Sequence, residues 1–112
     1  MDGIMRKSDA LNAISALADS TRLDVFKLLV RAGSGGLPAN AIAVELHLPQ
    51  SGLSAHLNTL IHAGLIRRHR DGVLVRYYAS PEHVRGLVRF VFENVDTVAG
   101  AFSPKLPDSI AC

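Results

Sequence analysis

Residues 50–62, QSGLSAHLNTLIH, combine two kinds of side chain at helical spacing. At about 100° per residue, a helix here gathers its leucines on one side. The opposite side then offers hydroxyl, amide and imidazole groups for hydrogen bonds, and one methyl group, from Ser51, Ser54, Asn58, His62 and Ala55. Residues 49–66 contain no Lys, Glu or Arg, whereas a solvated helix face is usually charged. The pattern indicates a face that approaches a partner closely and hydrogen-bonds to it.

Positive charge is concentrated directly after this stretch. The 112-residue chain has a formal net charge of only +2, but residues 46–78 hold four arginines against one aspartate. The arginines are Arg67, Arg68, Arg70 and Arg76. Guanidinium groups suit phosphate oxygens, so a basic segment beside an uncharged polar face is typical of nucleic-acid binding.

The sequence offers little for metal coordination or nucleophilic catalysis. Successive histidines lie 9, 6, 7 and 14 residues apart, and none forms the H-x₃-H pair of a helical metal site. Ser54 and His56 are about 160° apart around a helix axis, outside hydrogen-bond reach. The only cysteine is Cys112, the last residue. We therefore expect no enzyme, and we take Cys112 as the one candidate thiol ligand for a metal.

The apolar pattern preceding residue 50 predicts three helices. Ser8 is placed to cap the first, and Asp19 or Ser20 to cap the second. A Gly-Ser-Gly-Gly loop follows, and Pro38 suits the first turn of a short third helix. The third helix and the helix at 50–62, joined by a tight turn, have the outline of a helix-turn-helix.

The periodicity changes after Gly64. Residues 65–70 and 73–79 are apolar-basic runs separated by Asp71-Gly72, which is a strong hairpin signal. A last helix is expected from Ser80 onwards. The predicted fold is therefore mainly α with a small β-hairpin: a winged helix-turn-helix in residues 1–100, and a loosely ordered tail in residues 101–112.

In this fold the polar face of residues 50–62 and the hairpin arginines would bind the same partner, double-stranded DNA. The helix at 50–62 would lie in the major groove, and the hairpin arginines would contact the backbone. His56 has an equally good structural interpretation, as a brace against the turn, and Arg76 can equally be an ion-pair partner. The residues predicted to bind DNA are Gln50, Ser51, Ser54, Ala55, His56, Asn58, Arg68, Arg70 and Arg76.

Several motifs of the chain are specific as a set. They are ALADSTRLDVFKLL (residues 16–29), LPANAIAVEL followed by LPQSGLSAHLNTLIHAGLI, and RRHRDGVLVRYY. Together they resemble the ArsR/SmtB family of bacterial metalloregulatory repressors. The resemblance implies a homodimer that binds an operator palindrome and releases it when an inducer binds. It also implies a dimer interface on the first and last helices, with Leu11, Ile14, Leu87, Val88, Val91 and Val95 as candidate residues.

The inducer sites of the family are not reproduced here. Pro38 and Asn40 occupy the positions of a dithiol site on the third helix, and His83 alone matches a zinc site on the last helix, although zinc needs three or four ligands. Three alternatives stay open. The inducer is arsenite or a divalent metal, with Cys112 as the remaining candidate ligand; the signal is non-metal or absent; or the winged helix serves as a protein-protein module.

The sequence also indicates a compartment. One cysteine allows no intrachain disulfide, and the start, MDGIMRKSDA, lacks the apolar run of a signal peptide. No stretch is apolar enough to span a bilayer. We expect a cytoplasmic protein whose partners are DNA and a second copy of itself, with no membrane.

Overall fold

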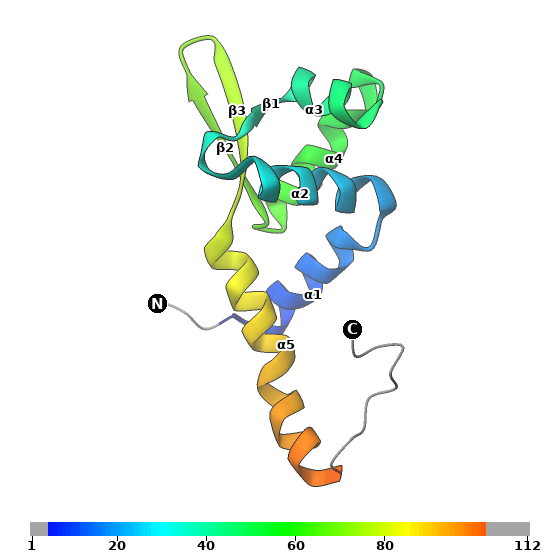
Figure 1. Ribbon diagram of the computed structural model, residues 1–112, viewed down its shortest axis with the longest axis vertical. Coiled ribbons are helices and arrows are strands. Elements are labelled where there is room, and N and C mark those ends of the chain that lie inside the picture. Colours follow the sequence, from blue (N-terminus) through cyan, green and yellow to red (C-terminus); the bar gives the residue numbers. More distant parts are fainter. Residues whose placement is uncertain (1–4, 103–112) are drawn as a thin grey trace.

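The computed structural model describes the backbone of residues 5–102 and the side chains of residues 5–93. The elements are α1 (Lys7–Leu17), α2 (Ser20–Ala32), the 3₁₀ turn η1 (Gly33–Gly35), β1 (Leu37–Pro38), α3 (Ala39–Leu46), α4 (Gln50–His62), β2 (Ile66–Asp71), β3 (Leu74–Ala79) and α5 (Pro81–Phe102). In Figure 1 the first four helices and the sheet form one body, from which α5 projects. The predicted winged helix-turn-helix order is confirmed.

The core lies between α2, α4 and the base of the hairpin. The leucine stripe of α4, Leu53, Leu57 and Leu60, is buried as predicted and packs in the same cluster as Leu29 of α2 and Ile66 of β2. Burying a side chain of this size stabilises the fold by about 1.5–3 kcal/mol. This packing holds the opposite face of α4 towards solvent.

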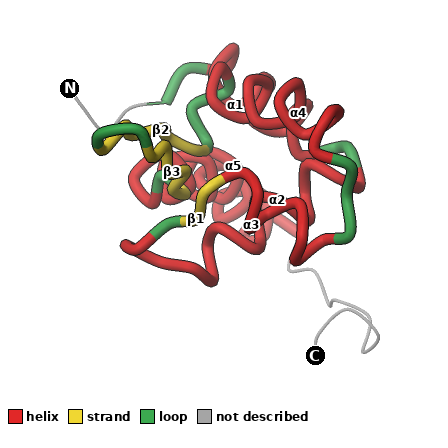
Figure 2. The backbone as a smooth tube through the Cα atoms, turned by 90° about the horizontal axis from the view of Figure 1, so that it is seen from above, coloured by secondary structure: helices red, strands yellow, loops and turns green. Residues whose placement is uncertain are grey.

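The first helix reaches the core mainly with small residues, and Leu17 at its end also packs against the core. Its buried positions are Ala10, Ala13 and Ala16, whereas Leu11 and Ile14 are exposed. Figure 2 shows α1 running beside α4, and α1 contacts α4 as well as α2. Alanine allows helix axes to approach closely, and Leu11 and Ile14 remain on the outer face of α1.

The sheet has a third strand that the sequence did not predict. Its order is β1-β3-β2, and β1 pairs antiparallel with β3 through Leu37 opposite Tyr77 and Pro38 opposite Arg76. Two residues are too short for an alternating pattern. Pro38, predicted in the first turn of the third helix, instead belongs to β1 and immediately precedes α3.

The hairpin loop is shifted by one residue from its predicted position. Asp71 pairs with Leu74, so the loop residues are Gly72 and Val73 rather than Asp71 and Gly72. Gly72 has a φ of +67°, and a positive φ at the first loop position alone is typical of a type II′ turn, which places no glycine requirement on the second residue.

Helix ends differ from prediction at two places. The cap of α1 is Arg6, whose N–H donates to Asp9 Oδ2 at 3.4 Å, and Ser8 lies inside the first turn. The last helix continues to Phe102 and so includes the first two residues of the expected tail. Within residues 5–102 we find no helix that combines the length and apolarity needed to cross a bilayer.

Candidate nucleic-acid interface

The outer face of α4 is accessible along its length. Gln50, Ser51, Ser54, Ala55 and Asn58 are all exposed, as is His62 at the helix end. The hydroxyl of Thr59, on the same face, donates to the Ala55 carbonyl at 3.1 Å and is thereby satisfied within the helix. The face that remains is uncharged, short-chained and able to donate and accept hydrogen bonds.

A tight turn holds α4 against α3. His47 adopts a left-handed conformation with φ 55°, which is uncommon outside glycine. The N–H of Leu48 then donates to the Ala43 carbonyl at 2.9 Å, closing the end of α3. Leu48 packs against the core, so α4 leaves the turn in a fixed direction.

The arginines of β2 are divided between the two faces of the sheet. Side chains alternate along a strand, so Arg68 and Arg70 share a face with Ile66, which is buried beside α4, and Arg67 lies on the other face. Arg68 and Arg70 are exposed and, with Val75 and Tyr77, line a shallow hollow of about 370 Å³. Two of the predicted DNA-binding arginines are therefore on the α4 side of the wing.

Arg76 has a structural role within the fold. Its guanidinium donates to the carbonyl of Gly35 at 3.1 Å and to that of Gly36 at 3.3 Å. It therefore ties β3 to the loop that precedes β1. Both bonds use Nη1, and Nε and Nη2 carry three further N–H donors, so a DNA contact by Arg76 stays a prediction.

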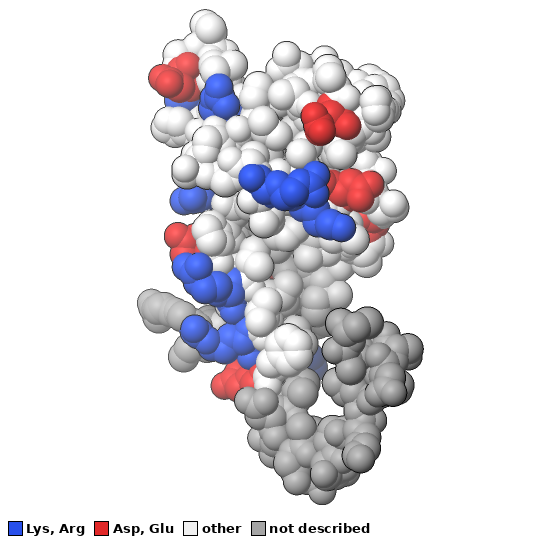
Figure 3. Space-filling model, viewed as in Figure 1, with Lys and Arg blue, Asp and Glu red and all other residues white. Residues whose placement is uncertain are grey.

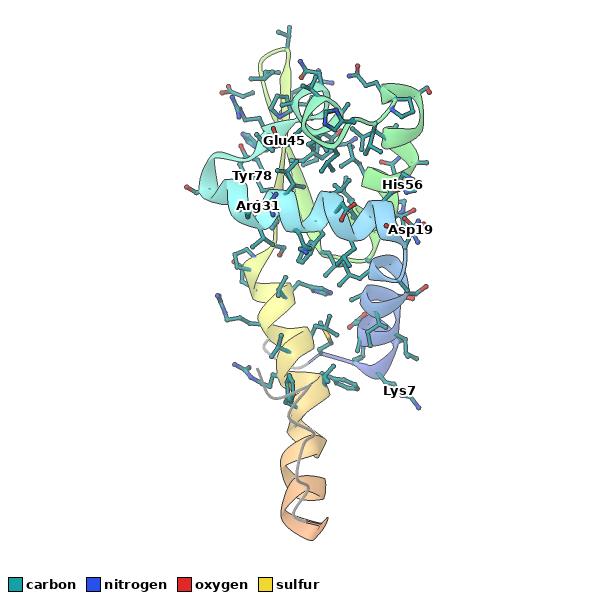
Figure 4. All side chains as sticks on the ribbon, turned by 45° about the vertical axis from the view of Figure 1, so that its right-hand side comes forward. Lys7, Asp19, Arg31, Glu45, His56 and Tyr78 are labelled. Atoms are coloured by element: carbon teal, nitrogen blue, oxygen red, sulfur yellow. The ribbon has the colours of Figure 1, made fainter. Side chains whose placement is uncertain are left out.

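His56 lies beside the start of α2. It is partly buried, and Figure 4 shows it next to Asp19, the cap of α2. The pKa of Asp19 is lowered, chiefly by the hydrogen bond from the Arg22 N–H and also by the charges of Arg22 and His56, against an opposing effect of burial. This environment favours the bracing interpretation of His56 over a DNA contact.

An exposed apolar face covers parts of α1 and α5, two helices that contact each other (Figure 1). Leu87 belongs partly to the core, because it is half-buried and packs against the central cluster. The side chain of Val95, also predicted at the dimer interface, lies outside the described residues. Phe92 adds to the face, although it was not among the predicted interface residues. The large apolar residues exposed by 41–55% are Leu11, Ile14, Val88, Val91 and Phe92.

Metal ligands do not gather in the described part of the chain. Residues 5–93 contain no group of three or more His, Cys, Asp or Glu placed to hold an ion. The ring of His83 lies against Gly64, and its Nε2 is buried without a hydrogen-bond partner. Cys112, the candidate thiol ligand, lies outside the described residues.

Comparison with known proteins agrees with this geometry. Residues 17–69 match a helix-turn-helix domain family. An uncharacterized HTH-type transcriptional regulator of Methanocaldococcus jannaschii is 34% identical over 84 residues, which are 75% of this chain and 92% of the relative.

Two solved structures have the same fold. An ArsR-like transcriptional regulator from Rhodococcus matches with a TM-score of 0.72 at 23% identity, over 84% of this chain and 85% of that one. A homodimeric winged helix-turn-helix DNA-binding domain from Mycobacterium bovis matches with a TM-score of 0.63 at 22% identity, over 83% and 84% of the two chains.

Proposed function

The chain belongs to the ArsR/SmtB family of winged helix-turn-helix transcriptional regulators, and from this premise we propose that it is a cytoplasmic repressor that binds an operator palindrome as a homodimer. The observation that carries the proposal is the exposed, uncharged outer face of α4 next to the two arginines on the α4 side of the wing. The first would read bases and the second would fix the protein on the backbone.

The outer face of α4 suits the floor of a major groove. Ser51, Ser54 and Asn58 have short side chains with donors and acceptors that match base edges, and Ala55 offers a methyl group for thymine. Gln50 at the helix start can reach a phosphate or a base. Long charged side chains would hold the helix away from the bases.

The wing would supply the electrostatic part of the affinity. Arg70 is the described arginine nearest the hairpin tip, and Arg68 precedes it on the same face. Each phosphate neutralised releases counterions, so the binding constant falls with salt by a slope close to the number of contacts.

A homodimer would place two copies of α4 about one helical turn of DNA apart. Support for the dimer is the exposed apolar face of α1 and α5. The similar Mycobacterium bovis domain is homodimeric, and a contact through α1 and α5 would leave α4 and the wing free for DNA.

The test is fluorescence anisotropy with the duplex upstream of the protein's own gene. We expect binding to a palindrome in that duplex, a steep loss of affinity with salt, and much weaker binding to a scrambled duplex of equal length. Weak binding that is equal for both duplexes and insensitive to salt would instead indicate a protein-protein module.

The inducer is a separate question that the same assay decides. Arsenite, Zn²⁺ and Cd²⁺ are titrated into the complex of the full chain and of Cys112→Ser. Release by arsenite that Cys112→Ser abolishes would identify the thiol as the sensor. We propose a non-metal signal instead, because residues 5–93 hold no ligand cluster, and we expect no release by any of the three.

A further inference from the structure

A cavity of about 750 Å³ that is open to solvent lies beside the base of the wing. The end of α2, the adjoining loop, β2 and β3, and the first turns of α5 line it, and most of its β-strand residues (Arg67, His69 and Tyr78) are on the face of the sheet away from Arg70. Its apolar lining includes Leu29, Val30, Tyr78, Ala79 and Val84. Small-molecule sites typically have this size, with an apolar lining and a few placed polar groups.

The charged side chains that line the cavity are all arginines. Arg67 and Arg68 come from β2, and Arg85 comes from α5, while Ser34 and His69 add hydrogen-bonding groups. Figure 3 shows Lys and Arg side chains along the edge of the molecule formed by the first half of α5. No Asp or Glu is among the described residues that line the cavity, so its electrostatic character favours an anion.

Glu82, one residue after the start of α5, is a carboxylate that interacts with two of these arginines. Its pKa is lowered, first by a hydrogen bond from its own backbone N–H and also by the Ser80 hydroxyl and the charges of Arg67 and Arg85. The Ser80 hydroxyl donates to Glu82 Oε1 at 3.3 Å. Glu82 does not line the cavity, but it neutralises part of the positive charge there. Arg67 and Arg85 carry two positive charges against its one negative charge, so a net positive charge remains.

Arg68 connects the cavity with the DNA-facing side of the wing. It lines this cavity and also the shallow hollow that contains Arg70. An anion held beside Arg68 would therefore change the position of a residue that we expect at the phosphate backbone, or the electrostatic potential around it.

We propose that this cavity binds a small organic anion with an apolar body, such as an aromatic or medium-chain carboxylate or sulfonate. Its apolar part would contact Val30, Tyr78 and Val84, and its acidic group would contact Arg67 and Arg85. Occupancy would weaken DNA binding through Arg68, a consequence that rests on the proposed function.

The site is tested without DNA, by titrating the full-length protein with the fluorescent anion 8-anilinonaphthalene-1-sulfonate. We expect one site per chain. The double variant Arg67→Gln/Arg85→Gln should weaken binding at least about tenfold, because two charge-assisted contacts are lost. The matched control Arg89→Gln, exposed on α5 and outside the cavity lining, should leave it unchanged.

The neutral analogue N-phenyl-1-naphthylamine separates charge from apolar contact. Its affinity should be unaffected by the arginine variant but lowered by Val30→Trp, which fills the cavity mouth. Circular dichroism checks folding, and Val30→Trp alone remains a test if the arginine variant does not fold. The absence of a binding site would overturn the proposal. Anion binding that is equal in all variants would also overturn it, because the dye would then bind elsewhere, for example on the apolar face of α1 and α5.

The coupling is measured by operator anisotropy with a red-emitting label. The anion should weaken wild-type binding but not that of Val30→Trp. Unchanged operator affinity with an occupied cavity would overturn the coupling alone. A protein that binds no duplex even without the anion would overturn the proposed function and the coupling, while the DNA-free titration would still decide the site.

Discussion

The carboxylate of Asp19 accepts the backbone N–H of Arg22 at 3.0 Å, and the guanidinium of Arg22 lies 3.9 Å from the same carboxylate. The Nε of Arg22 also donates to the Ala16 carbonyl at 2.7 Å. The pair therefore closes the junction between α1 and α2, and this confirms the predicted cap at Asp19.

We expect Asp19→Ala to lower the urea midpoint of unfolding, because the N–H of Arg22 loses its acceptor. Asp19→Asn keeps an acceptor and should cost less. The stability contributed by the charge of Asp19 should also depend on pH. Since the folded-state pKa of Asp19 lies below its ordinary value of 3.8, its charge contributes stability above that pH and loses the contribution as pH falls through the lowered value.

Urea unfolding of wild type and Asp19→Asn at pH 7 and near pH 2.5 checks this sign. The difference between the two midpoints should shrink at the lower pH. A difference that stays constant over this range would contradict the role of the charge.

Arg76→Ala should destabilise the fold by about 1–2 kcal/mol, because two carbonyls of the loop before β1 lose a charged donor. His69→Ala is the matched control: His69 is directly opposite Arg76 on β2, is exposed, and its side chain forms no hydrogen bond with another described residue. Its cost should stay within about 0.5 kcal/mol. Equal midpoints for the two variants in urea unfolding would refute a structural role for Arg76.

Asn58→Ala and Arg70→Ala should affect DNA binding in different ways. Loss of a base contact by Asn58→Ala should cost about 1–3 kcal/mol on the palindrome and little on scrambled DNA. Loss of a phosphate contact by Arg70→Ala should weaken both duplexes and reduce the salt slope by about 1. Anisotropy over a salt series measures both quantities, and full binding by the double variant would exclude this interface.

Val91→Glu should convert the dimer to a monomer and reduce operator affinity, because a carboxylate would be buried in the apolar face of α1 and α5. Val44→Glu, which changes a 74% exposed valine on α3, controls for added charge and should remain dimeric. Sedimentation analysis gives the oligomeric state. A dimer of undiminished strength in Val91→Glu would place the interface elsewhere.

Gly64→Ala should destabilise the protein by about 2 kcal/mol or more, for two reasons. Gly64 has a φ of +80°, and an added Cβ would lie 2.8 Å from the ring of His83. In the His83→Ala background, which lacks the ring, Gly64→Ala should no longer cause the steric clash. Its cost in unfolding free energy should there fall to the backbone contribution of about 1 kcal/mol. Thermal unfolding of the four proteins gives this cycle, and strict additivity would contradict the contact.

The candidate interface was predictable from sequence where it depended on local periodicity. The leucines of α4 recur at helical spacing, so their burial also determined that Ser51, Ser54 and Asn58 are exposed. Arg70 close to a glycine turn could likewise be assigned to the wing, although the loop itself was misplaced by one residue.

Other roles required the tertiary structure, because they depend on residues far apart in the chain. Arg76 contacts carbonyls 40 and 41 positions away, and β1 exists only through its pairing with β3. The division of Arg67 from Arg68 and Arg70 follows from which face of β2 packs beside α4. Periodicity therefore determined the order of elements and the exposed face of α4. Packing decided which arginines lie on the α4 side of the wing, which one holds a loop and which line the cavity, because side chains of one type differ only in what the fold places beside them.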